Sequence, residues 1–195
     1  MQIALVRHGK PNVDPDDRIL PNPVAFVEEY NRAGIDPMLP PPERVRELAA
    51  GSTYVLSSNL PRAIESLRIL APGREGPAER IYREAGFPPL PDIIVALNPP
   101  LWVTLKILKR LGWLSDDSRI AESLAKARGR ARAASRRLVG LAETHGSVLL
   151  VGHGMFNTLI ASELNAAGWV GPRWPTRGYW SAATYLHSSR APIGE

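Results

Sequence analysis

The chain has 195 residues, of which 44% are hydrophobic and 22% charged, as is typical of a globular protein with a buried core. It contains no cysteine, which excludes disulfides, thiolate zinc sites and cysteine nucleophiles. The formal net charge is +5, but the arginines are spread along the chain, and the densest group lies on one predicted helix. We interpret that group as a solvated helix face rather than a nucleic-acid interface.

No apolar run approaches the ~18 residues that a membrane-spanning helix needs, and the first residues are typical of a strand rather than a signal peptide. We therefore expect a cytoplasmic protein with no membrane partner. The length favours a single domain over residues 1–195.

The first predicted strand ends in a charged loop. Residues 1–6 are apolar except for Gln2, and Arg7-His8-Gly9 follows them. This pattern is typical of a buried strand that enters a loop. In open α/β sheets ligands bind at the carboxyl ends of strands, so a cation beside an imidazole indicates an anion site. A surface arginine and an ordinary loop histidine remain the alternative.

Residues 11–42 are rich in proline. They predict a long loop around one short helix, near Pro23 to Arg32 and ended by Gly34. Such loops often cover or bind ligands, so we expect a variable lid near 11–42 and a second near 88–115. A plain surface excursion is the alternative.

A second buried strand is predicted over Thr53 to Leu56. It follows a helix that starts at Glu43 and stops at Gly51, and it leaves through Ser57-Ser58-Asn59.

The next helix is predicted from Leu60-Pro61 to Leu70, capped by Ser58 or Asn59. Arg62 lies in its first turn, where a cation opposes the helix dipole unless it faces an anion.

The remaining elements continue the alternation of strands and helices. We predict a short strand at Arg80–Tyr82, helices at Leu101–Leu111 and Ile120–Glu143, a buried strand at Ser147–Val151, a helix to Leu164 and a last strand near Ala182–His187. The third buried strand leaves through Gly152-His153-Gly154. This alternation favours an α/β fold with three layers.

Three motifs that each follow a predicted strand resemble those of one known family. They are Arg7-His8-Gly9, the stretch from Ser57 to Ala63, and the stretch from Val151 to Gly154. Their order and spacing are similar to those of the histidine phosphatase superfamily, also called the phosphoglycerate mutase-like family. The resemblance covers Gln2 to about His187. It implies an α/β/α sandwich with a mostly parallel central sheet.

The chain departs from the family pattern near the motifs. Lys10-Pro11 stands where Gln-Thr is common, Asn59 where Asp is common and Ser66 where Thr is common. None of these departures removes a charged group of the motifs.

The motif residues suit phosphoryl transfer, which needs positioning and positive charge around the phosphate oxygens. Arg7 and Arg62 can each offer a planar fork of donors, and His153 adds a donor at a helix N-terminus. Ser58 and Gly154 are further candidates for substrate binding. We expect no metal and no cofactor, because the arginines and histidines supply the charge.

His8 is the candidate nucleophile, which would form a phosphohistidine. Arginines close to it would keep its imidazole neutral. A carboxylic acid must protonate the leaving alkoxide, and Glu84 is our choice, with Asp92 as the fallback. A solvated loop carboxylate is the alternative for Glu84.

Other histidines and the tryptophans are interpreted as structural. His145 is expected at a helix C-terminus and His187 at a strand end. The tryptophans are expected to pack in the core or a lid, at positions Trp102, Trp113, Trp169, Trp174 and Trp180.

The expected function is a metal-independent phosphatase acting on phosphomonoesters of small molecules. A phosphoglycerate mutase-type phosphotransferase and a phosphoprotein-binding or regulatory module are the alternatives. Assembly into a homo-oligomer is a further hypothesis.

Overall fold

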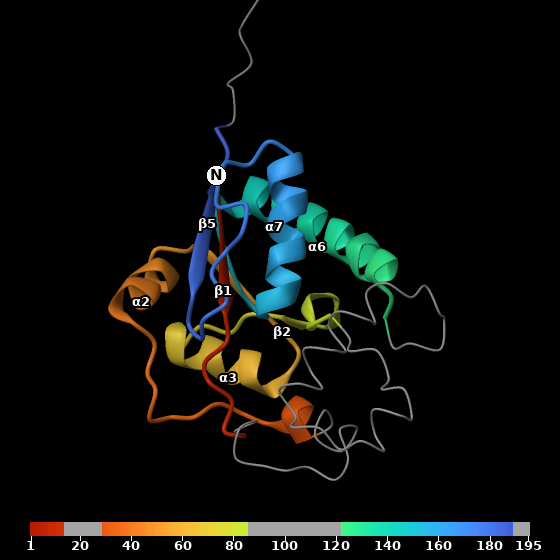
Figure 1. Ribbon diagram of the computed structural model, residues 1–195. Helices are drawn as coiled ribbons and strands as arrows, with labels where there is room; N and C mark the ends of the chain where they lie inside the picture. The colour runs from red at the N-terminus through yellow and green to blue at the C-terminus, as the bar shows by residue number, and fades with distance from the viewer. Residues whose placement is uncertain (14–28, 86–121, 189–195) are drawn as a thin grey trace, which may run out of the picture.

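The computed structural model describes residues 1–13, 29–85 and 122–188 (Figure 1). Its centre is a five-stranded sheet in the order β3-β2-β4-β1-β5. The strands are β1 (Gln2–Arg7), β2 (Tyr54–Ser58), β3 (Ala78–Glu79), β4 (Ser147–Gly152) and β5 (Ala182–Leu186). All neighbours pair in parallel except β1 and β5, which are antiparallel.

Helices cover both faces of this sheet. They are α2 (Glu43–Ala50), α3 (Pro61–Leu70), η1 (Arg80–Tyr82, a 3₁₀ turn), α6 (Leu124–His145) and α7 (Gly154–Ala166). Figure 1 shows α2 and α3, in orange and yellow, on one side and α6 and α7, in green and blue, on the other. The predicted three-layer α/β/α sandwich with a mostly parallel sheet is confirmed.

The two faces of β1 belong to separate cores. Ile3 and Leu5 pack with α6 and α7, whereas Ala4 and Val6 pack with α2 and α3. Successive side chains of a strand point to opposite faces, so a strand covered on both sides must be apolar throughout. This is why the buried strands read as continuous apolar runs in the sequence.

The predicted strand at Arg80–Tyr82 is wrong. Strand β3 comprises only the two residues before it, and it pairs with β2 up to Ser58 and Glu79. Since β2 ends at Ser58, the chain has no strand partner beyond that point. It closes a 3₁₀ turn instead, in which the backbone N–H of Arg83 donates to the carbonyl of Arg80 (3.1 Å).

One predicted helix cap and one helix start differ from the structure. Helix α3 starts at Pro61, as predicted, but its N-cap is Leu60 rather than Ser58 or Asn59. Helix α6 starts at Leu124, because the Ser123 hydroxyl accepts from the backbone N–H of Lys126 (3.3 Å) and caps it.

Some predictions fall outside the described residues. They are the helix at Leu101–Leu111, the fallback acid Asp92, Trp102, Trp113, residues 14–28 of the first expected lid and all of the second. Of the proline-rich segment, residues 11–13 and 29–42 are described, and residues 29–32 are helical, as predicted for the end of that helix. No helix in the described part of the chain has the length and apolarity to cross a membrane.

Candidate active site

Three adjacent strands deliver the motif residues to one edge of the sheet. Strand β4 lies between β2 and β1, and Arg7 pairs in register with Gly152. His8 follows β1 and His153 follows β4, so the two histidines emerge side by side, with ring centroids 5.1 Å apart. Both are buried. The grouping predicted from the strand-exit motifs is therefore present.

His8 is held in one orientation by its own loop. Its Nδ1 lies 2.7 Å from the carbonyl oxygen of Gly9, a contact in which the imidazole N–H donates. The other ring nitrogen, Nε2, then keeps its lone pair. Burial, and after it the positive charges of Arg62 and Arg7, hold the pKa of His8 well below its usual range. The neutral imidazole needed for nucleophilic attack is the favoured form.

Arg62 comes from the first turn of α3 and is only 1% exposed. Its Nε donates to Nε2 of His8 (3.3 Å), and its Nη1 donates to the carbonyl of Tyr30 (2.8 Å). The conflict between this cation and the helix dipole pointed to a site, and the side chain does contact the candidate nucleophile.

Ser66 ties the two motifs together, and its role was not predicted. Its hydroxyl accepts from the backbone N–H of Gly9 (2.9 Å) and donates to the carbonyl of Arg62 (2.6 Å). The position was noticed only as a departure from the family pattern. Its tie to the first motif crosses from α3 to the loop after β1, so sequence spacing gave no signal for it.

Gly9 is required because the backbone approaches Trp180 closely. A Cβ at this position would lie 2.5 Å from the indole ring. Trp180 is 5% exposed, and its Nε1 donates to the carbonyl of Leu39 (2.8 Å). Trp180 and Trp169 are thus core residues, as predicted, whereas Trp174 is exposed.

His153 is the N-cap residue of α7 and has no exposed surface. Its Nε2 shares a hydrogen bond with the Ser58 hydroxyl (2.8 Å). Its Nδ1 is buried and has no hydrogen-bond partner among the described residues. Burial is the main cause that lowers the pKa of His153, and the nearby His8 and Arg62 lower it further.

Arg7 ends β1 and is half-buried. Its Nη1 donates to the carbonyl of Arg177, and its guanidinium carbon lies 4.2 Å from the centre of the Tyr179 ring. The Nε of Arg7 is buried without a hydrogen-bond partner in the part of the chain that is described. Gly154 lies beside this side chain, and a Cβ there would meet Cδ of Arg7 at 3.4 Å.

Glu84 is not a freely solvated loop carboxylate. Its Oε1 accepts from the backbone N–H groups of Phe156 (2.9 Å) and Ala85 (3.0 Å), and its Oε2 accepts from Met155 (3.4 Å). These contacts seat the carboxylate at the N-terminus of α7, directly after His153. These hydrogen bonds fix the orientation of the carboxyl group. Its role as an acid stays a prediction.

Arg130 of α6 is a further residue that the sequence did not single out. Its guanidinium pairs with both carboxylate oxygens of Glu122 (2.7 and 2.6 Å) and donates to the carbonyls of Ile81 (2.8 Å) and Arg83 (2.7 Å). It also lies 3.7 Å from the centre of the Phe156 ring. In the sequence Arg130 is one of several arginines on a predicted helix, and the interpretation of that group as a solvated face is wrong for Arg130.

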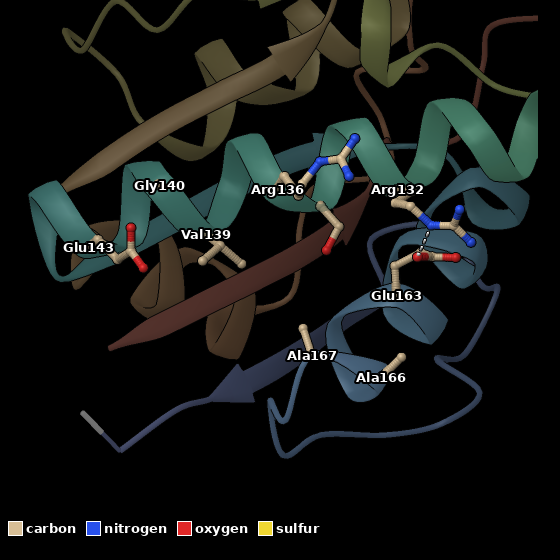
Figure 2. Close-up of a pocket in the computed structure, with 9 residues that line it drawn as sticks. Arg132, Arg136, Val139, Gly140, Glu143, Glu163, Ala166 and Ala167 are labelled. Carbon is tan, nitrogen blue, oxygen red and sulfur yellow. Dashed lines mark hydrogen bonds and ion pairs between the residues drawn. The ribbon is translucent and has the colours of Figure 1, made fainter. Parts of the chain in front are cut away.

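A separate hollow of about 370 Å³ lies between α6 and α7 (Figure 2). Its lining residues are Arg132, Ser135, Arg136, Val139, Gly140, Glu143, Glu163, Ala166 and Ala167. Arg132 and Glu163 form an ion pair across it (3.1 Å). It shares no residue with the strand-end site, by which we mean Arg7, His8, Arg62, Glu84 and His153.

The described residues contain no group of three or more histidine, aspartate, glutamate or cysteine side chains placed to hold a metal ion. His145 ends α6 and His187 follows β5, as predicted. His145 stacks on Tyr54 and His187 packs on Trp169, and neither belongs to the strand-end site.

Comparison with known proteins supports the fold. No protein-family model and no curated protein sequence matches the chain. Among solved structures, the protein TTHB049 from Thermus thermophilus is similar, with 21% identity, 96% of this chain and 98% of the other covered, and a TM-score of 0.57.

Two further similar structures are phosphatases. A phosphoserine phosphatase from Entamoeba histolytica, in complex with phosphoserine, is 14% identical and has a TM-score of 0.55. The match covers 95% of this chain and 90% of the phosphatase. The ecdysone phosphate phosphatase from Bombix mori, in complex with tungstate, is 13% identical and has a TM-score of 0.57. The match covers 100% of this chain and 96% of that phosphatase. The chain therefore shares the fold of these structures, a phosphoglycerate mutase-like α/β/α sandwich. The resemblance inferred from its motifs is confirmed at the level of the fold.

Proposed function

We propose that this protein is a metal-independent phosphatase that hydrolyses phosphomonoesters of small molecules through a phosphohistidine on His8. The observation that carries the proposal is a buried imidazole whose Nδ1 lies against the carbonyl of Gly9 and whose Nε2 faces Arg62. Burial and the nearby arginines lower its pKa, which favours the neutral form. A nucleophile and the positive charge that a phosphoryl group needs thus meet at one point.

In the first step the Nε2 lone pair of His8 attacks phosphorus, and the bond from phosphorus to the leaving oxygen breaks. Arg62 donates to Nε2 in the free protein across 3.3 Å, which is a long hydrogen bond. An incoming phosphate oxygen would take over this donor and release the lone pair. Arg7 and His153, each with a buried nitrogen that has no partner among the described residues, supply further donors.

The leaving alkoxide then takes a proton from Glu84. In the second step Glu84, now a carboxylate, removes a proton from water, and the oxygen of that water attacks phosphorus. The bond between phosphorus and Nε2 breaks and returns the electron pair to His8. The seat of Glu84 at the N-terminus of α7, next to His153, supports this assignment. Asp92 remains the fallback if Glu84 proves dispensable.

The phosphatases of the same fold suggest the substrate class. Their named substrates, phosphoserine and ecdysone phosphate, are phosphomonoesters of small molecules, and tungstate is an oxyanion similar to phosphate. We infer that the segments near 11–42 and 88–115 contact the rest of the substrate, as parts of a single domain.

The test is hydrolysis of p-nitrophenyl phosphate in excess EDTA. We expect activity in the wild type and its loss in His8→Ala, whereas the control variant His187→Gln, at the far end of β5, keeps it. Activity that survives in His8→Ala would refute the nucleophile, and activity that requires an added metal would refute metal independence. A wild type that is inactive on a broad phosphoester panel would refute the hydrolase.

A further inference from the structure

Two tyrosines lie against the two arginines of the strand-end site. The ring centre of Tyr30 is 4.5 Å from the guanidinium carbon of Arg62, and that of Tyr179 is 4.2 Å from the guanidinium carbon of Arg7. Tyr179 also lies 5.9 Å from the imidazole of His8, between ring centres. The same geometry thus occurs twice, built from segments far apart in the sequence.

An aromatic ring on the face of a guanidinium constrains how that group can bind. The five N–H donors of arginine lie in its plane, so the edges remain available when a ring covers one face. The ring attracts the cation and keeps water from that face. A stacked arginine is therefore oriented before the anion arrives, which lowers the cost of binding it.

Backbone contacts complete each arrangement. Arg62 donates to the carbonyl of Tyr30 (2.8 Å), so this residue holds both a face and an edge of the guanidinium. Arg7 donates to the carbonyl of Arg177, two residues before Tyr179. Each arginine thus has a tyrosine ring on its face and a carbonyl of the same segment on one edge.

We propose that Tyr30 and Tyr179 are positioning residues that preorganise Arg62 and Arg7 for a phosphate group. This inference rests on the proposed function, because it takes the two arginines as phosphate ligands. The aromatic ring is the active part of each side chain, and the hydroxyl is dispensable for orienting the arginine. Burial raises the pKa of Tyr30, so its phenol stays neutral and does not neutralise Arg62 by ion pairing.

The surroundings of Tyr179 separate this role from ordinary packing. Its side chain is 37% exposed, so it contributes little to the core. Trp174, on the same segment, is 71% exposed and provides a matched aromatic control. Removal of either ring should leave the fold intact, and only removal of the Tyr179 ring should affect Arg7.

The test measures binding of inorganic phosphate by isothermal titration calorimetry in excess EDTA, for Tyr179→Leu, Tyr179→Phe and Trp174→Leu. We expect Tyr179→Leu to weaken phosphate affinity roughly 3- to 30-fold, the range that a cation–π contact supports. Tyr179→Phe and Trp174→Leu should bind like the wild type, and all three should keep the wild-type melting temperature.

The same comparison of phosphate affinity for Tyr30→Leu and Tyr30→Phe tests the contact between the Tyr30 ring and Arg62. In hydrolysis assays the loss should appear mainly in KM, because the arginines bind the phosphate already in the ground state. If Tyr30→Leu is less stable than the wild type, its loss of affinity cannot be assigned to Arg62 alone. The comparison of Tyr179→Leu with Tyr179→Phe then tests whether an aromatic ring orients the arginine.

Unchanged phosphate affinity in Tyr179→Leu would overturn the inference, and so would an equal loss in Tyr179→Phe, which would assign the effect to the hydroxyl. These results leave the proposed function standing if the wild type hydrolyses phosphoesters through His8. A wild type that neither binds phosphate nor hydrolyses phosphoesters would refute the proposed function itself.

Discussion

The hydrogen bond between His8 and the carbonyl of Gly9 determines which ring nitrogen can react. It fixes the proton on Nδ1, so that Nε2 faces Arg62 with its lone pair. Burial makes the largest contribution to the low pKa of His8, and Arg62 makes the next largest. The same arginine that would bind phosphate therefore also keeps the nucleophile neutral.

This coupling predicts the pH dependence of activity. Because the pKa of His8 lies well below 6.5, kcat/KM on p-nitrophenyl phosphate should begin to fall with decreasing pH only below that value. In Arg62→Gln the activity is lower overall, and the acidic limb should move to higher pH, since one cause of the low pKa is removed. Both profiles use the same substrate, so its own ionisation cancels in the comparison. An acidic limb that stays in place would contradict the assigned role of Arg62.

At the scale of elements, α6 acts on the site through the loop that carries Glu84. Arg130 holds two carbonyls of that loop and its guanidinium lies on the Phe156 ring, while the backbone N–H of Phe156 binds Glu84. Helix α6, the 3₁₀ turn and the start of α7 are thus joined around one guanidinium. The arrangement places a carboxylate next to His153.

Arg130→Gln should both destabilise the fold and lower kcat. It removes the ion pair with Glu122, whose side chain is only 15% exposed, so we expect a loss of about 3 kcal/mol in the free energy of unfolding. Arg132→Gln on the same helix is the control: its side chain is 62% exposed, and its ion pair with Glu163 should contribute below ~1 kcal/mol. Urea unfolding and steady-state kinetics of both variants check this. Equal losses of unfolding free energy and of kcat in the two variants would contradict the role of Arg130 in holding the loop that carries Glu84.

Sequence reasoning succeeded for elements whose pattern is local. The apolar runs of β1, β2 and β4 predicted buried strands because both faces of the sheet are covered, and the polar residues after them marked the site. It failed where the structure of a residue depends on a partner far away in the sequence. The short β3 stops because β2 stops, and Arg130, Ser66 and the tyrosines reach the site only through the packing of separate segments.

For the whole molecule, two buried neutral histidines link stability to pH. His8 and His153 both have pKa values well below the 6.5 of an exposed histidine. Below pH 6.5 the unfolded chain therefore binds more protons at these positions than the folded protein does. The contribution of these two histidines to the unfolding free energy therefore falls as the pH decreases from 6.5, and above that pH it no longer changes.

The expected slope is at most ~1.4 kcal/mol per pH unit for each histidine. Urea unfolding at several pH values between 5 and 8, with the wild type beside the double variant His8→Gln and His153→Gln, would measure it. The double variant should show a shallower decline below pH 6.5. An identical decline in both proteins would mean that other groups are responsible.

The most direct test of the central claim is to isolate the covalent intermediate. The wild type is mixed with p-nitrophenyl phosphate whose phosphoryl oxygens are isotopically labelled. The reaction is stopped within milliseconds in alkali, which preserves phosphohistidine, and the digested peptides are analysed by mass spectrometry. We predict one labelled phosphoryl group on His8 and none in His8→Asn. Glu84→Gln should hold more of the label, because nitrophenolate leaves without a proton whereas the attack of water is slowed. A label on another residue, or turnover with no label at all, would contradict the account.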